Sequence, residues 1–384
     1  MTEFCQSVGY SQAFNTIDAA AGHQIEEASF LRSKFYDQDY IQLWTRNGGN
    51  SLQYTHWILD AALQRSYITG DLKFLGDQLP GMLAMWDEWQ PFYDTNVSLY
   101  YYYPTKDAQE FSLPGYVAGP HNVTIQNRGP YTYRPSHNGY MVANARAIAM
   151  AASIANNQTV QENFTNIADT IETAMYQHLW DHQLNFFMDV IRTNNPNLTR
   201  LTGREEVGAF PYRFGVGLST QYMNGAVHAL FDPTSFLTQY GPTTLETSNQ
   251  YYFALKPTTY CCYWNGQSWP FSTAQVLDSL AHIYRTGNSS LSAQQYYQYL
   301  RMYALTQYKD GIPYVAESHY PEIDRWSADS TNHSEHYDHS TNNYNVLTGL
   351  LGVVPQASDV FQINPIIPSN WTYFALKIFH IIPI

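Results

Sequence analysis

The chain has 384 residues, of which 44% are hydrophobic and 16% aromatic, enough for one large domain or two ordinary ones. Its net charge is −13 and its 19 Lys and Arg residues do not cluster, so we do not expect nucleic acid as a partner. No run reaches the roughly 18 to 20 apolar residues that span a bilayer, so no membrane helix is expected.

Helical periodicity dominates the chain from residue 51 onward. It predicts three helical hairpins, in chain order 51–68 with 72–89, 138–155 with 159–179, and 271–285 with 291–308. Two of the turns contain Thr-Gly, where Gly70 and Gly287 are expected to adopt positive φ just past a helix end.

Helical hairpins distributed over the chain predict an all-α fold, a toroid of paired helices. A linear solenoid is the rival interpretation, although no strict repeat period is visible. We expect the toroid to occupy residues 1–360. Alternation in the segment FALKIFHII predicts a strand at 374–382, so residues 361–384 are expected to begin a β region.

Four long loops separate the helices and contain many aromatic residues, histidines and carboxylates. They cover 91–137, 190–216, 240–271 and 309–343. Loops of this length are usually functional or disordered, and their aromatic content argues against disorder. If short turns and long loops alternate, the long loops lie at one rim, which is then the expected active-site face.

Three groups of carboxylates lie in these loops: Asp107 with Glu110; Glu317 with Glu322 and Asp324; and Glu335 with Asp338. Glycoside hydrolysis needs one carboxylic acid to protonate the leaving oxygen and a second carboxylate to activate water or attack directly. Two distant carboxylates that meet across a cleft would satisfy this need. The signal is weak alone, because every soluble protein has loop carboxylates.

The segment CCYWNGQSWPFSTAQ brings two tryptophans and two amides to the start of a predicted helix. Trp264 and Trp269, with Asn265 and Gln267 between them, suit a stacking wall for a sugar ring. The alternative is that Trp269 packs in the core at the helix entry, with Ser272 or Thr273 as N-cap. The 33 tyrosines and 9 tryptophans of the chain allow the same two interpretations, an aromatic core or a sugar-stacking cleft.

A third motif, GPYTYRPSHNGYM, contains Arg134, His137 and Asn138, with a helix expected to begin near Asn138. The Arg134 guanidinium would either clamp a substrate or pair with a loop carboxylate. His56 and Trp57, in the first predicted hairpin, complete the expected substrate-binding residues.

We expect neither a metal nor another cofactor. His333, His336 and His339 are spaced by three, but the zinc pattern HExxH is absent, and so are a phosphate-binding loop and a serine nucleophile elbow. The three cysteines, Cys5, Cys261 and Cys262, show no zinc spacing and say little about redox compartment.

Glycosylation sequons are numerous, although the N-terminus lacks the pattern of a signal peptide. Together with the low lysine content they favour a secreted glycoprotein. The eight sequon asparagines are Asn96, Asn122, Asn157, Asn163, Asn197, Asn288, Asn332 and Asn370.

In these motifs and their order, the sequence resembles the six-hairpin glycosidases from about Glu26 to its end. Among them it resembles the mannosylglycerate hydrolase-like group, which is related to glycoside hydrolase family 63 and more distantly to trehalases. The resemblance implies an (α/α)6 barrel and hydrolysis with inversion, with the two carboxyl groups about 6.5–9.5 Å apart. It also implies that burial and the second carboxylate raise the pKa of the acid.

The resemblance also implies roles for individual residues. AQEFS matches the acid segment, which makes Glu110 the general acid, with Asp107 as a substitute because relatives carry Asp there. Glu317, with Pro321 four residues later, matches the base. Glu335 in SEHY resembles a substrate-binding glutamate and is the reserve candidate for the base.

Two further segments match the resembled families. Trp264 to Trp269 matches W-x-G-P-x-W, with Gln267 in place of proline, and His137 with Asn138 matches a Leu-Asn that opens a helix. We therefore expect an exo-acting, inverting glycosidase with a carbohydrate as its partner. The alternatives are a catalytically inactive carbohydrate-binding relative and, less favoured, an epimerase or lyase on the same barrel.

Overall fold

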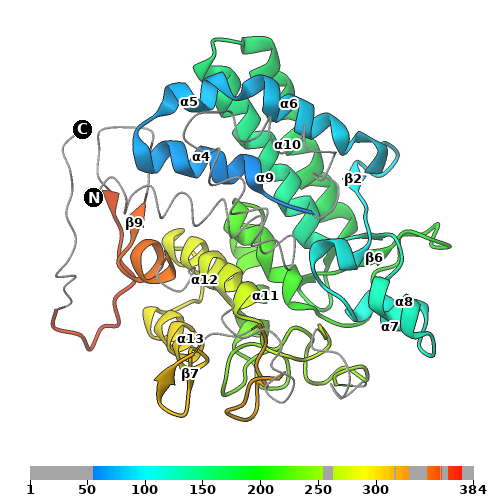
Figure 1. Cartoon of the computed structure of the whole chain (residues 1–384), viewed down its shortest axis with the longest axis vertical. Helices are drawn as coiled ribbons and strands as arrows, with labels where there is room; N and C mark the ends of the chain where they lie inside the picture. The colour runs from blue at the N-terminus through cyan, green and yellow to red at the C-terminus, as the bar shows by residue number, and fades with distance from the viewer. Residues whose placement is uncertain are drawn as a thin grey trace.

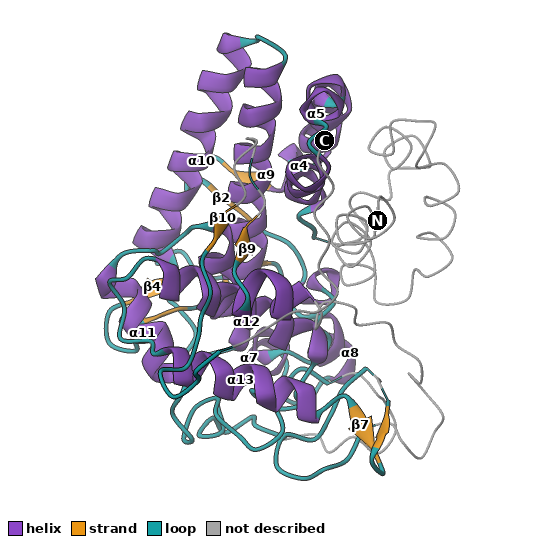
Figure 2. Ribbon diagram, turned by 90° about the vertical axis from the view of Figure 1, so that its left-hand side faces the viewer, coloured by secondary structure: helices purple, strands orange, loops and turns teal. Residues whose placement is uncertain are grey.

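The computed structural model describes residues 55–253, 263–314, 317–327, 344–354, 356 and 362–373. Helices dominate these segments, and all the strands are short, two-residue antiparallel pairs at turns and loops (Figures 1 and 2). The all-α expectation is confirmed. None of the helices in these ranges is long and apolar enough to cross a membrane.

The helices and strands follow in chain order. The α-helices are α4 (Ile58–Thr69), α5 (Leu72–Asp77), α6 (Leu79–Glu88), α7 (Leu113–Ala118), α8 (Val123–Arg128), α9 (Pro135–Ile154), α10 (Gln158–His178), α11 (Thr220–Leu230), α12 (Pro270–Arg285) and α13 (Ala293–Leu305). The 3₁₀ helices are η2 (Gln90–Phe92), η3 (Pro104–Asp107) and η4 (Glu206–Phe214), and η5 (Asn345–Leu350) is a π-helix. The paired strands are β1 (Tyr93–Asp94) with β2 (Leu99–Tyr100), β3 (Thr132–Tyr133) with β6 (Val190–Ile191), β4 (Trp180–Asp181) with β5 (Phe186–Phe187), β7 (Tyr308–Lys309) with β8 (Ile312–Pro313), and β9 (Val353–Val354) with β10 (Gln362–Ile363).

The three predicted hairpins are present. Helices α9 and α10 run side by side and make the most extensive helix contact of the described residues (Figure 2). The hairpin of α12 and α13 is confirmed, and the first hairpin consists of α4 followed by two shorter helices, α5 and α6. Gly70 and Gly287 have φ of 71° and 70°, as the Thr-Gly turns predicted.

Two helix starts were predicted too late. Helix α9 begins at Pro135 rather than near Asn138, and α12 begins at Pro270 with Trp269 at the N-cap position. The prediction of Ser272 or Thr273 as N-cap is therefore wrong, and both hydroxyls donate back to the carbonyl of Trp269. Proline explains both shifts, because its fixed φ suits the first helical turn and its missing N–H is not needed there.

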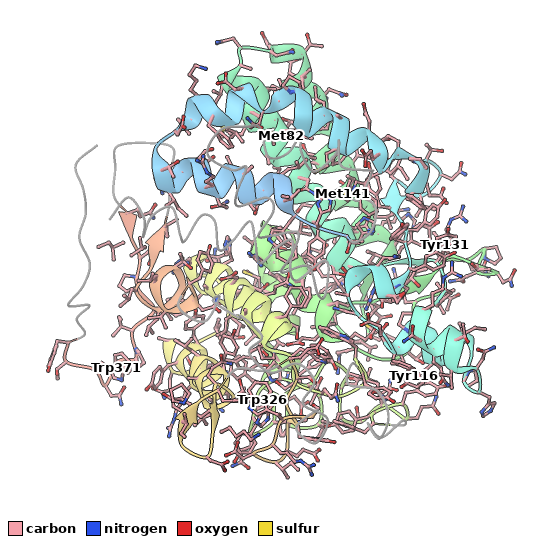
Figure 3. All side chains as sticks on the ribbon, viewed as in Figure 1. Met82, Tyr116, Tyr131, Met141, Trp326 and Trp371 are labelled. Carbon is pink, nitrogen blue, oxygen red and sulfur yellow. The ribbon has the colours of Figure 1, made fainter. Side chains whose placement is uncertain are left out.

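Five helical segments form an inner row, in which each contacts the next: α4, α9, η4, α12 and η5. Helices α10 and α13 pack against α9 and α12 on the outside. Within the described residues the row does not close into a ring. Helix α9 is buried on nearly all sides, as an inner helix must be, and Met82 of α6 and Met141 of α9 lie in the core (Figure 3).

The inner helices begin close together. Trp57, directly before α4, has its ring 4.8 Å from that of Tyr140 near the start of α9 and 6.1 Å from that of Phe271 at the start of α12. The Tyr140 hydroxyl also donates to the amide oxygen of Gln275 on α12. Residues that precede these helices are thereby brought to one face of the molecule.

The C-terminal expectations are not tested. The predicted strand at 374–382 lies outside the described residues, and the proposed boundary at residue 360 stays a prediction.

Candidate active site

The four long loops contact one another, as predicted. Loop 91–137 meets loop 240–271 where the Trp264 N–H donates to the Glu110 carbonyl, 3.0 Å away. It meets loop 190–216 where the Leu113 N–H donates to the Glu205 carboxylate. Loop 240–271 meets loop 309–343 through paired backbone hydrogen bonds between Ser268 and His319. The loops therefore form one assembly.

Glu110 lies half-buried in this assembly, against Trp264. Burial raises the pKa of its carboxyl group, while a hydrogen bond from its own backbone, the Trp264 side chain and the charge of Lys106 act in the opposite direction. Because burial outweighs them, the carboxyl group holds its proton to a higher pH than an exposed glutamate does. A general acid needs this property.

The backbone on both sides of Glu110 is unusual. Ala108 and Phe111 both lie in the left-handed region, with φ of 55° and 56°, although neither is glycine. Such conformations cost free energy, persist only where the surroundings impose them, and cluster at active sites. The segment 108–111, which contains Glu110, is thus held in a strained form.

Trp264 and Trp269 stack with ring centroids 4.2 Å apart and planes 11° apart. Trp264 also meets Phe271 edge-on, and Phe271 is stacked near Trp57. An aromatic wall, Trp264–Trp269–Phe271–Trp57, therefore runs from Glu110 to the start of α4. Both tryptophans are almost fully buried. They therefore pack in the core at the start of α12, and the same pair lies next to the candidate acid.

The two amides between the tryptophans shape the loop. The Asn265 side chain donates to the Tyr251 carbonyl, and the Gln267 side-chain oxygen accepts from the Tyr263 N–H. The Trp269 indole donates to the Tyr263 carbonyl. These bonds fix the wall, and a role of either amide in substrate binding stays a prediction.

Glu317 belongs to the loop that pairs with the C-terminal end of the segment 263–269. It is 4% exposed and comes two residues before His319, whose backbone pairs with Ser268 directly before Trp269. The segment 263–269 therefore contacts the Glu110 loop at one end and the Glu317 loop at the other.

Asp107 is held within the protein. One carboxylate oxygen accepts from the Thr55 hydroxyl at 2.5 Å, and the other accepts from the Ser136 hydroxyl. The Arg134 guanidinium lies 3.8 Å away. Burial raises the pKa of Asp107, while Arg134 and the two hydroxyls act against it. These contacts are those of a residue that fixes the loop.

Arg134 is the centre of a buried ionic network and is itself 2% exposed. Besides Asp107, its guanidinium lies 3.1 Å from Asp189 and 3.2 Å from Glu205. Burial raises the pKa of Glu205 well above its usual value, against the effect of Arg134, and Asp189 raises it further. Of the two predicted roles for Arg134, pairing with carboxylates is the one with observed contacts.

Histidine and asparagine at the start of α9 are also buried. The Asn138 side chain exchanges hydrogen bonds with the backbone of Tyr100 and so ties β2 to α9. Burial, His56 and Arg134 lower the pKa of His137 to about 3, so its imidazole is neutral at ordinary pH. The rings of His137 and His56 lie 4.8 and 6.0 Å from that of Trp89.

Three buried carboxylates of this region were missed by the sequence analysis: Asp189, Glu205 and Glu206. Asp189 interrupts the apolar run FFMDVI, and an ionisable residue in such a run indicates a buried partner. Glu205 is the N-cap residue of η4 and Glu206 is its first residue, directly before apolar residues, and burial raises the pKa of Glu206 well above its usual value. Those two patterns were the available signals.

Some predicted residues lie outside the described residues, namely Glu335, His333, His336, His339 and all three cysteines. Within the described ranges no group of three or more metal-ligating side chains is found.

The fold is that of the (α/α)6 glycosidases. The structure is similar to GH63 mannosylglycerate hydrolase from Thermus thermophilus in complex with glucose, with a TM-score of 0.56, 10% identity, and coverage of 78% of this chain and 77% of that chain. It is also similar to neutral trehalase Nth1 from Saccharomyces cerevisiae, with a TM-score of 0.57, 12% identity, and coverage of 89% and 70%.

A third solved structure, a sialidase, has a TM-score of 0.75 and 26% identity over 87% of this chain. The match covers 30% of that protein, so the chain spans less than a third of its length. The family model of the mannosylglycerate hydrolase MGH1-like glycoside hydrolase domain matches residues 13–340. The chain belongs to this family. No match to a curated protein sequence is found.

Proposed function

We propose that the chain is an inverting, exo-acting glycosidase with Glu110 as general acid and Glu317 as general base. The observation that carries the proposal is the setting of Glu110. It is half-buried beside Trp264, its pKa is raised by burial, and strained backbone flanks it on both sides. Membership of a glycoside hydrolase family supports the reaction class.

In the proposed reaction the Glu110 carboxyl group gives its proton to the glycosidic oxygen as the bond to the anomeric carbon breaks. Glu317 takes a proton from a water molecule, whose oxygen attacks that carbon from the opposite face. The product therefore has the opposite anomeric configuration. The buried tryptophans of the aromatic wall lower the local dielectric around the acid, and its half-buried member Phe271 offers apolar surface to the C–H face of a sugar ring.

The contacts of Asp107 favour Glu110 over Asp107 as the acid. Both Asp107 oxygens accept hydroxyl hydrogen bonds and a guanidinium lies beside them, so the group is not available to a substrate. We infer that Asp107, Arg134 and Asn138 position the loop and helix that carry the site. His56, Trp57, His137, Asn265 and Gln267 stay candidates for substrate contact.

The test is hydrolysis of a panel of p-nitrophenyl glycosides by single-residue variants. We expect E110Q and E317Q each to lower kcat at least about a hundredfold, as is usual for loss of acid–base catalysis. E322Q is the matched control, because Glu322 is an exposed glutamate of the same loop as Glu317. Activity near wild type in E110Q or E317Q removes that residue from its role, and a loss confined to E335Q moves the base to Glu335.

One alternative function has a specific observation in its favour. The acid position carries Glu where the resembled families carry Asp, and the extra methylene group displaces the carboxyl group, which motivates the alternative of a carbohydrate-binding relative without activity. Calorimetric binding of a sugar by the wild-type chain without any release of p-nitrophenol or free sugar would select this alternative.

We also propose that the protein is a secreted glycoprotein. The seven sequon asparagines within the described residues are all exposed, as glycan attachment requires: Asn96, Asn122, Asn157, Asn163, Asn197, Asn288 and Asn370. A mass shift on enzymatic deglycosylation of the protein from its natural source tests the proposal, and an unmodified mass refutes it.

A further inference from the structure

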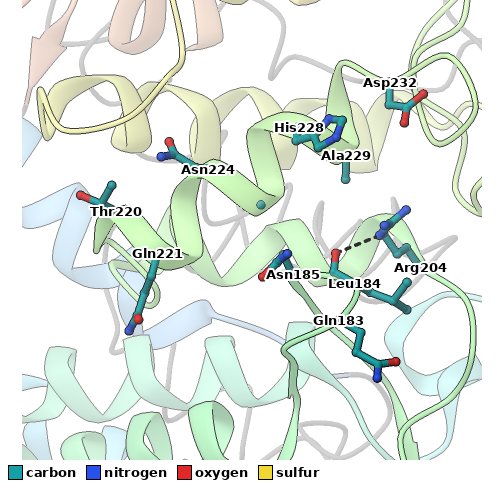
Figure 4. A pocket seen from close by; sticks show the side chains of 11 residues that line it. Gln183, Leu184, Asn185, Arg204, Thr220, Gln221, Asn224, His228, Ala229 and Asp232 are labelled. Atoms are coloured by element: carbon teal, nitrogen blue, oxygen red, sulfur yellow. Dashed lines mark hydrogen bonds between the residues drawn. The ribbon is translucent and has the colours of Figure 1, made fainter.

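A cavity of about 550 Å³ lies between α11 and the turn that joins β4 to β5 (Figure 4). Ligand pockets in proteins have volumes of about 300–1,000 Å³, so the cavity is of a suitable size. None of its lining residues belongs to the candidate active site, and α11 is not part of the inner row of helices. Any ligand here occupies a second site.

The wall of this cavity depends on one glycine. A Cβ atom at position 225 would lie 2.1 Å from the carbonyl oxygen of Asn185, so only glycine lets the turn rest directly on α11. Asn185 itself has φ of 50°, a left-handed conformation that asparagine tolerates better than most residues. The turn and the helix are therefore in direct backbone contact beside the cavity.

The charged groups of the cavity are already engaged within the protein. The Arg204 guanidinium lies 2.9 Å from Glu246 and donates to the Leu184 carbonyl, a bond drawn in Figure 4. The Asp232 carboxylate accepts from the N–H and hydroxyl of Thr234, at 2.7 and 2.8 Å. The charge of Arg204 is thus paired with that of Glu246, and the remaining carboxylate of Asp232 disfavours an anionic ligand.

Neutral carboxamides from both walls also line the cavity. Gln183 and Asn185 come from the turn, and Gln221 and Asn224 from α11. A carboxamide both donates and accepts, which matches the paired donor and acceptor capacity of neighbouring sugar hydroxyls. We propose that this cavity is a second carbohydrate site, which binds a neutral oligosaccharide.

Two sources of such an oligosaccharide are compatible with the position of the cavity. The first is free carbohydrate. The second is a glycan attached to the chain itself, because the exposed sequon Asn288 borders the cavity. The Thr220 hydroxyl donates to the Asn288 carbonyl, and the Ser290 N–H donates to the Asn224 side chain at 2.8 Å.

The first arm of the test uses the full chain made without glycans and carrying E110Q and E317Q to prevent turnover. Mannobiose, maltose and cellobiose are titrated while the imidazole NMR signals of His228, which lines the cavity, report binding. We expect at least one disaccharide to shift these signals, and Q183A/Q221A to raise its dissociation constant about fivefold or more through loss of two amides.

The matched control is Q158A/Q161A, which likewise removes two glutamine amides, here from the outer helix α10, and should leave binding unchanged. Inorganic phosphate and glucuronate are titrated in parallel. The proposal predicts that neither competes with the neutral disaccharide, since Arg204 is already paired.

The second arm uses glycosylated protein. Peptide N-glycosidase F is applied under native conditions, and release is followed by mass spectrometry at Asn288 and at Asn157, the exposed N-cap of α10. A glycan held in the cavity is released more slowly from Asn288, and Q183A/Q221A removes this protection.

A positive result in either arm supports the site and identifies the source. The proposal is overturned if Q183A/Q221A changes neither disaccharide binding nor glycan release, or if only the anionic probes bind. Hydrolysis of p-nitrophenyl glycosides is measured separately on chains with Glu110 and Glu317 intact. Its absence would count against the proposed glycosidase and leave this site unaffected.

Discussion

Replacing Arg134 with methionine tests how the buried network holds the site. The guanidinium lies 3.1 Å from Asp189 and 3.2 Å from Glu205, and none of the three side chains is more than 5% exposed. Removing one partner of a buried ion pair costs about 3–5 kcal/mol, because the remaining charge stays buried without compensation. We therefore expect R134M to lower the free energy of unfolding by at least about 3 kcal/mol at pH 7.

The free energy of unfolding that R134M loses should increase with pH. Burial already raises the folded-state pKa of Asp107 and Glu205 in the presence of Arg134, which acts to lower both. Without the cation both pKa values rise further. The folded variant then holds protons that the unfolded chain releases, so its stability falls as pH rises above the unfolded carboxyl pKa of about 4. The deficit should be smaller at pH 5 than at pH 7.5.

Urea unfolding at the two pH values measures both quantities. R192M is the control, because Arg192 lies 3.3 Å from Asp94 but is 39% exposed, and such a pair contributes about 1 kcal/mol or less. If R134M costs no more than R192M, or if its cost is equal at both pH values, the network does not stabilise the fold as argued.

Further predictions concern the acid, the mechanism, a histidine and the second cavity. W264F should move the alkaline limb of kcat/KM to higher pH, because the indole lowers the pKa of an acid that must be protonated, and an unmoved or lowered limb contradicts this. Proton NMR of freshly formed product should show the inverted anomer, and a retained one refutes the single-step reaction. The His137 imidazole should not titrate between pH 5 and 8, since its pKa is about 3, and NMR that finds a transition in that range rules out its burial as a neutral group. G225A should lower the free energy of unfolding by about 1–3 kcal/mol through overpacking against Asn185, whereas an unchanged urea midpoint would show that the turn moves away freely.

Much of the fold could be predicted because its information is local. The period of apolar residues placed α9, α10, α12 and α13, and the Thr-Gly turns gave the positive φ of Gly70 and Gly287. The starts of α9 and α12 were misplaced because the periodic face was given more weight than the proline in the first turn.

The site was less predictable because its contacts join residues far apart in the chain. Arg134 pairs with residues 55 and 71 positions later, and no periodicity links them. The loop assembly followed from the alternation of turns and loops, whereas the distinction between Asp107 and Glu110 needed the Thr55 and Ser136 hydroxyls. The same limit applies to the cavity beside α11, which depends on the fit between Gly225 and Asn185.

The shared starting face of the inner helices has an electrostatic consequence. Each α-helix carries a macrodipole whose N-terminal end is equivalent to about half a positive elementary charge. Trp57, Tyr140 and Phe271 bring three such ends together at α4, α9 and α12. Carboxylates gather at this same face in a chain of net charge −13, and the helix ends offset part of their mutual repulsion. The peptide backbone thereby supplies a positive potential that does not change with pH, because it comes from no titratable group.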